Sequence, residues 1–168
     1  MSDLLSIQNK FINHWGTLGS SWGVNRTMTQ IHALLMVSTE PITTDAVMER
    51  LQISRGNAHS NLKELVAWGI ARLEIVSGER KDCYVADQDP WKLLCTVARE
   101  RKRREIEPAL DALAECLNEA SPLKDKEAKA FKKQLSELQE FLEMADRIFS
   151  KLGRSEKSRV MKLLAALI

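Results

Sequence analysis

The chain has 168 residues, of which 44% are hydrophobic and 29% are charged, a composition that suits one compact globular domain with appended helices. No apolar run approaches the roughly 18 residues that a membrane span needs, and no basic, apolar leader opens the chain. We therefore expect a cytoplasmic protein without a membrane segment. The formal net charge of +2 conceals an uneven distribution, because residues 41–104 hold 12 basic and 9 acidic side chains.

The side chains that usually carry catalysis or bind metals are few and scattered. Cys83, Cys95 and Cys116 show no metal-ligand spacing, so we expect reduced, packed thiols, with a redox-sensing thiol as the alternative. The three histidines form no H-E-x-x-H motif, and the sequence has no glycine-rich phosphate loop and no G-x-S-x-G elbow. These absences predict no cofactor, no metal and no enzymatic activity, although a Cys–His pair assembled by folding remains an alternative.

Two helices are predicted in the first 40 residues. Apolar side chains recur at helical spacing over residues 3–18, and the pattern stops among Gly16, Gly19 and Gly23, which we expect to break the helix. A second helix is predicted over residues 26–37, and Pro41 prevents its continuation.

The next segment predicts two short helices followed by a β-hairpin. Thr43 or Thr44 caps a helix that ends near Leu51, and Ser54 caps a helix that runs to Trp68. Residues 72–76 alternate polar and apolar side chains, a turn is predicted at 77–80, and residues 82–85 return as a second strand, an order that is typical of a β-hairpin. This order predicts a mainly α fold with a small β-hairpin wing, a winged helix-turn-helix, joined to long helices.

Long helices are predicted for the rest of the chain. One opens at Asp89-Pro90 and should be kinked or interrupted at Pro108, and its charged run 99–105 is either a solvated connector or a flank that contacts DNA or a partner. Another opens at Ser121-Pro122 and carries a heptad seam over residues 131–152, which requires a partner helix from the same chain or another. Gly153 should end it, and Ser155 should cap a final helix.

The predicted helix 54–68 has one apolar and one polar face. Ala58, Leu62, Leu65 and Val66 form the apolar face, and Gly56 leaves room for close approach near the helix start. Polar side chains of the kind that bind base edges or phosphates in the major groove are predicted as DNA contacts: Ser54, Arg55, Asn57, His59, Ser60, Asn61 and Lys63. The alternative is an ordinary solvated helix face.

The predicted hairpin carries Arg80 and Lys81 at its turn, where basic side chains can enter a minor groove or bind a phosphate. Pairing of these cations with Glu79 or Asp82 on an exposed loop is the alternative. Arg26, Thr43 and Thr44 are further candidates for phosphate contacts that set the register on the duplex.

The ordered motifs resemble one family. Ile53-Ser54-Arg55-Gly56-Asn57, Trp68-Gly69-Ile70, Gly78-Glu79-Arg80-Lys81-Asp82 and Asp89-Pro90-Trp91 are similar to the GbsR branch of the MarR-type regulators. The resemblance implies a homodimeric transcription regulator, generally a repressor, that places two recognition helices on a pseudo-palindromic operator in double-stranded DNA. It implies dimerisation helices at 1–24 and 91–168 around a DNA-binding domain at 25–90.

Some members of that branch resemble choline sensors, which suggests a small-molecule effector of the quaternary ammonium class. Such a ligand needs an aromatic cage, and Phe11, Trp15, Trp22 and Trp91 are the candidates, although core packing is the alternative role. The rival to DNA binding is a winged helix used only for protein–protein contact.

Overall fold

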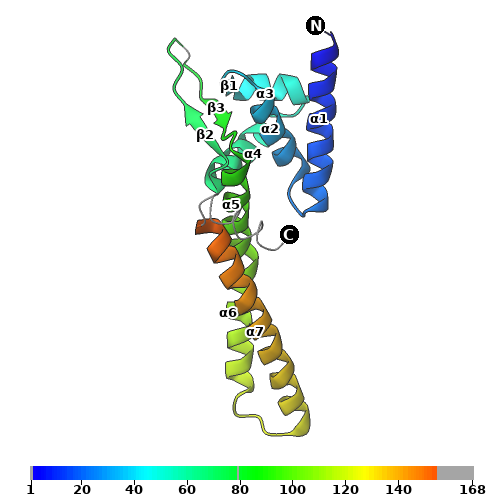
Figure 1. Ribbon diagram of the computed structural model, residues 1–168, viewed down its shortest axis with the longest axis vertical. Helices are drawn as coiled ribbons and strands as arrows, with labels where there is room; N and C mark the ends of the chain where they lie inside the picture. The colour runs from blue at the N-terminus through cyan, green and yellow to red at the C-terminus, as the bar shows by residue number, and fades with distance from the viewer. Residues whose placement is uncertain (1, 79, 155–168) are drawn as a thin grey trace, which may run out of the picture. The chain divides into compact units, whose positions relative to one another are not determined.

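A computed structural model describes residues 2–78 and 80–154 of the chain (Figure 1). The described part is mostly helical, with one three-stranded antiparallel sheet, which confirms the predicted fold class. It divides between Leu93 and Leu94 into two units. None of the described helices is long and apolar enough to cross a membrane.

Helix α1 (Ser2–Ser21) continues through two of the glycines that were expected to break it, so that prediction was wrong. Gly16 and Gly19 face α2 (Arg26–Val37), and a Cβ on Gly19 would lie 2.3 Å from Thr29 Cγ2. These glycines therefore permit a close crossing of two helices. Only Gly23, at φ +74°, adopts the left-handed conformation that follows the helix end.

In the first unit, helices α1 and α2, two further helices and the sheet pack around one apolar core. Helix α3 (Thr44–Leu51) and helix α4 (Arg55–Trp68) are joined by a tight turn in which Gln52 has φ 54°. Helix α4 packs against α2, α3 and the sheet. The core residues with no exposed surface are contributed by these helices: Ile31, Ala33, Val47, Ala58, Leu62 and Leu65.

The sheet has the order β1-β3-β2 and contains one strand that the sequence analysis did not predict. Strand β2 (Ala71–Glu74) and strand β3 (Cys83–Ala86) form the predicted hairpin, with Leu73 opposite Tyr84. The additional strand β1 (Ile42–Thr43) pairs with β3, so that Thr43 lies opposite Cys83. The wing is thereby joined to Thr43, the residue that caps α3.

Helix α5 (Pro90–Arg101) opens as predicted, since the Asp89 carboxylate accepts a hydrogen bond of 2.9 Å from the Trp91 amide. The expected interruption before Pro108 takes the form of a π-helical turn, η1 (Lys102–Ile106), which leads into α6 (Glu107–Ala120). The wider turn accommodates the proline, which has no amide proton to donate. The charged run is extensively paired: Arg103 and Arg104 both bond Glu100, while Lys102 contacts Glu107 and Asp146.

Helix α7 (Lys126–Arg154) begins later than predicted. Ser121 ends α6, and the first turn of α7 is capped by Asp125, whose carboxylate accepts from the Ala128 amide at 2.8 Å. The partner of the heptad seam is α6 of the same chain, which packs along α7 in a helical hairpin (Figure 1). Phe131 and Leu138 within the seam remain about half-exposed. The helix predicted after Ser155 lies outside the described residues.

The buried His32 makes the stability of the core depend on pH. It lies on α2 with 3% of its surface exposed, and its Nε2 meets no hydrogen-bond partner among the described residues. Burial lowers the pKa of His32 from 6.5 to about 4. Between these two values the unfolded chain binds a proton that the folded chain excludes, so stability falls as the pH decreases.

We expect the free energy of unfolding to drop by roughly 3 kcal/mol on this account between pH 7 and pH 4. Urea titrations of the parent and of His32→Leu across this range check the value, and the substitution should flatten the pH dependence. His14→Leu, which removes an exposed imidazole from α1, should leave the parent's dependence in place. An unchanged slope in His32→Leu would assign the loss of stability to other groups.

The close crossing of α1 and α2 gives a second prediction. Gly19→Ala should destabilise the protein by about 1–2 kcal/mol, because the new methyl group meets the branched side chain of Thr29. Gly16→Ala is the matched control: its nearest neighbour is the flexible Gln30 side chain, at 2.5 Å, which can move aside. Thermal denaturation of both variants measures the difference. Adding Thr29→Ala to Gly19→Ala should recover only part of the loss, because the Thr29 Cβ, at 2.7 Å, remains. Equal losses in the two single variants would contradict this account.

Candidate nucleic-acid interface

Helix α4 is held at both ends and along one side. The hydroxyl oxygen of Ser54 caps it by accepting a hydrogen bond from the Asn57 amide at 3.3 Å, and Gly69 ends it at φ 73°. Its inner side is buried, as expected from the apolar pattern. The outer side exposes most of the polar residues that the sequence analysis named: Ser54, Arg55, Asn57, His59, Ser60 and Lys63.

Asn61 does not join that exposed face. Only 7% of its surface is exposed, and its side-chain amide donates to the Asn57 backbone carbonyl at 2.8 Å and to the Asn57 side-chain oxygen at 2.7 Å. Its predicted role as a direct base contact is therefore corrected. Asn61 instead orients Asn57, which lies one turn earlier on the exposed side.

An open hollow of about 880 Å³ brings three elements together. It is lined by residues from the start of α3, the first two turns of α4 and the approach to β3: Thr44, Asp45, Arg55, Gly56, His59, Lys81 and Asp82. Four of the predicted contact residues, Thr44, Arg55, His59 and Lys81, thus share one site. Arg26 is not part of its lining.

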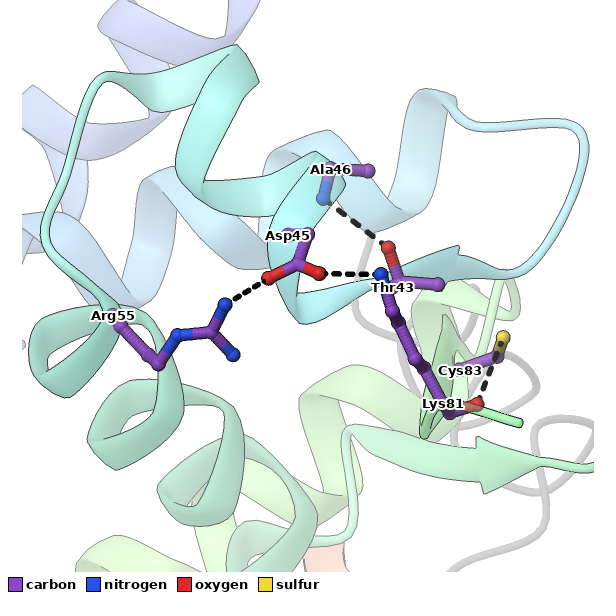
Figure 2. A network of polar contacts seen from close by, with 6 residues as sticks. All are labelled: Thr43, Asp45, Ala46, Arg55, Lys81 and Cys83. Carbon is purple, nitrogen blue, oxygen red and sulfur yellow. Dashed lines mark hydrogen bonds and ion pairs between the residues drawn. The ribbon is translucent and has the colours of Figure 1, made fainter. Parts of the chain in front are cut away.

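Asp45 connects the recognition-type helix to the wing, a role that the sequence analysis did not identify. One carboxylate oxygen lies 2.6 Å from Arg55 Nη2, and the other lies 2.7 Å from Lys81 Nζ. Figure 2 shows the carboxylate between the two cations. The hydrogen bond from Lys81, followed by the charge of Arg55, holds the pKa of Asp45 below its ordinary value against the opposing effect of burial.

The two threonines lie at the junction of β1 and α3. The Thr43 hydroxyl caps α3 by accepting from the Ala46 amide at 3.2 Å, as Figure 2 also shows. The Thr44 side chain hydrogen-bonds Tyr84 on β3, a contact that opposes the rise in the pKa of Tyr84 caused by burial and by Asp82. Both threonines are therefore placed beside the hollow by the local structure.

The wing beyond the sheet carries an exposed Arg80 and a turn in which Gly78 has φ +86°. Two large apolar side chains are exposed on the wing: Ile75, directly after β2, is 100% exposed, and Leu73, in β2, is 53% exposed. The expected basic side chains are thus present on the wing, Lys81 at its base and Arg80 on its exposed arm.

Three of the four aromatic residues predicted for the cage lie side by side. The rings of Phe11 and Trp15 lie 5.6 Å apart, and Trp22 meets Trp15 edge-on at 6.3 Å. Phe11 and Trp15 pack against the hydrophobic core, which fits the alternative role of core anchors. None of the four aromatic residues lines the hollow beside α4 or a second hollow of about 270 Å³ between the end of α2 and β3.

The cysteines are separate within the described chain. Cys83 and Cys95 are buried, and their thiols contact the carbonyl oxygens of Lys81 and Leu152 respectively, while Cys116 is exposed on α6. Across residues 2–78 and 80–154, no group of three or more His, Cys, Asp or Glu residues is placed to hold a metal ion.

Helix α2, the α3–α4 pair and the three-stranded wing together define a winged helix. Residues 22–81 match the model of the MarR family, and that match covers every residue that lines the hollow except Asp82. A solved structure described as the crystal structure of a transcriptional regulator is similar, with a TM-score of 0.68 and 17% identity over 88% of this chain and 96% of that one. No curated protein matches the chain in sequence.

Proposed function

We propose that this chain is a transcription regulator that binds double-stranded DNA with α4 in the major groove and the wing beside it. The observation that carries the proposal is the common hollow, in which the exposed start of α4 and the base of the wing present Arg55 and Lys81 together. The match of residues 22–81 to the MarR family supports the same function.

Direct base readout is assigned to the exposed residues of α4: Arg55, Asn57, His59, Ser60 and Lys63. Arginine and asparagine can each make two hydrogen bonds to one base edge in the major groove. The phosphate contacts are assigned to Ser54, Arg80, Lys81, Thr43, Thr44 and Arg26, which set the register without reading sequence.

Gly56 supports a close approach at the start of α4. A Cβ at this position would meet nothing within 4 Å, so packing inside the chain does not require glycine there. Glycine in a helix costs about 1 kcal/mol relative to alanine. The close approach of a ligand to the start of the helix, such as a DNA backbone, explains why glycine is present there despite its cost in stability.

The proposed assembly is a homodimer on a pseudo-palindromic operator. Helix α7 exposes one residue of its seam, Leu138, and three large apolar side chains next to the seam, Phe141, Met144 and Ile148, each with 47–58% of its surface accessible. An exposed apolar stripe of this kind marks an interaction surface. A second copy of α7 would cover it and give the two-fold symmetry that two half-sites require.

The finer assignments rest on the resemblance. The ordered motifs between Ile53 and Trp91 favour the GbsR-like branch, in which a dimer that covers a promoter acts as a repressor. The proposed effector, a quaternary ammonium compound near Phe11, Trp15, Trp22 and Trp91, is tested by calorimetry with choline and related osmolytes. Absence of heat with every compound would remove it.

The rival function is a winged helix that binds only protein. The exposed apolar side chains of Leu73 and Ile75 on the wing are the observation that favours it. Exposed Arg55, Lys63 and Arg80 favour DNA, because a protein-only module has no need of a basic wing beside a polar helix face.

Selection of bound fragments from a random DNA pool, followed by salt-titrated mobility shifts, tests the function. Arg55→Ala should weaken binding to the selected site at least about fivefold and relax specificity at one base position, as expected for a lost base contact. Arg80→Ala should weaken binding to all sequences and reduce the salt slope by about 1.

Lys133→Ala, on exposed α7, is the matched control, since it removes one cation outside the winged helix. It should leave the affinity unchanged. No enrichment of any DNA at low salt would reject the proposed function and leave the protein-only module.

The dimer is tested by light scattering and by the same mobility shifts. Phe141→Glu with Ile148→Glu should yield monomers and reduce the affinity for the selected site more than tenfold, because the second half-site no longer benefits from a tethered partner. Ser136→Glu, about 140° around α7 from Phe141, adds a charge without entering the stripe and should remain dimeric. A dimeric double variant would place the interface elsewhere.

A further inference from the structure

Asp45 occupies a position that works against simple attraction of DNA. Its carboxylate comes from the first turn of α3 and contacts one cation of α4 and one of the wing, at 2.6 and 2.7 Å. All three side chains are accessible: 36% of Asp45, 69% of Arg55 and 62% of Lys81 is exposed. The carboxylate therefore lies on the same open surface that DNA phosphates would approach.

The charges around the hollow balance each other. Arg55 and Lys81 contribute two positive charges, and Asp45 and Asp82 contribute two negative ones. A phosphate that enters the hollow gains the attraction of the cations and also meets the repulsion of the carboxylates. This opposition is independent of base sequence, because every phosphate carries the same charge.

A base edge differs from a phosphate in this respect. Guanine offers two acceptors to an arginine in the major groove but carries no net charge, so the carboxylate of Asp45 repels it less than it repels a phosphate. Exposed ion pairs are worth little and exchange readily, so Arg55 can turn from Asp45 to a base when the correct base is present. The Asp45 contact therefore penalises phosphate binding more than base recognition.

We infer that Asp45 is a specificity-determining residue, which lowers the affinity for non-specific DNA by neutralising Arg55 and Lys81 and releases Arg55 only to a matching base. This inference rests on the proposed DNA-binding function and adds a role for a residue that makes no favourable contact with DNA itself. It also explains why one acidic side chain joins two of the cations assigned to the nucleic acid.

The test compares the full-length parent with Asp45→Asn on two duplexes of equal length, one carrying the selected site and one of random sequence. In Asp45→Asn, the affinity for random DNA should rise about three- to tenfold at low salt, and the salt slope should steepen by about 1. The affinity for the selected site should rise less, so the ratio of specific to non-specific affinity should fall.

Two matched controls separate this role from net charge. Asp82→Asn removes a carboxylate that lines the same hollow, and Asp111→Asn removes an exposed one on α6. Both should change discrimination less than Asp45→Asn does. Equal effects from Asp82→Asn would overturn the inference, because general charge would then explain the result.

Asp45→Ser, with circular dichroism and thermal melting of each variant, guards against a folding defect, since serine is accepted in a first helical turn. Weaker binding of folded Asp45→Asn and Asp45→Ser to both duplexes would overturn the inference and make Asp45 only a positioning residue for Arg55. If the parent binds neither duplex, the proposed function itself fails, and that outcome is distinct from a loss seen only in the variants.

Discussion

The burial of one side of α4 is the constraint on which the rest of the winged helix depends. Ala58, Leu62 and Leu65 have no exposed surface, and the helix packs through them on α2, α3 and the sheet. Because these contacts fix the rotation of α4 about its own axis, they also determine which side chains face outward. The cap at Ser54 and the left-handed Gly69 then fix where that outward face begins and ends.

Strand β1 extends this constraint to the wing. Two residues suffice to pair Thr43 with Cys83, and the next residues along each strand begin α3 on one side and carry Lys81 on the other. The carboxylate of Asp45 can therefore reach Lys81 although 36 residues separate them in the sequence. The position of the wing relative to α4 is thus set by backbone pairing and reported by one exposed ionic contact.

Local sequence signals were sufficient to predict the helices whose ends carry a capping residue, a stop glycine or an N-terminal proline. The cap at Ser54, the stop at Gly69 and the Asp89-Pro90 helix start all act within four residues, so a single sequence reveals them. Gly16 and Gly19 were predicted to break a helix, but they permit a tertiary contact with α2 and do not form a turn. Asn61 was predicted to contact DNA because its side chain is polar. Its position, about 40° from Leu65 around the helix, places it toward the core.

The contacts of Asp45 could not be predicted from the sequence for a different reason: no periodic pattern connects the first turn of α3 with the base of a wing. The position of Asp45 beside two cations gives one reason why a single protomer would bind DNA weakly. With two cations and two carboxylates around the hollow, this part of a single winged helix gains little from the phosphate backbone. Additional surface cations would raise its affinity for every sequence alike.

Pairing two winged helices raises affinity in another way. Once the first half-site is occupied, the second contact becomes intramolecular, and affinity multiplies without any added positive charge. A protein that limits its phosphate binding at Asp45 therefore depends on association for affinity. In this proposal the exposed apolar side chains of α7 supply the association, and Arg55, freed from Asp45 only by the correct base, supplies the discrimination.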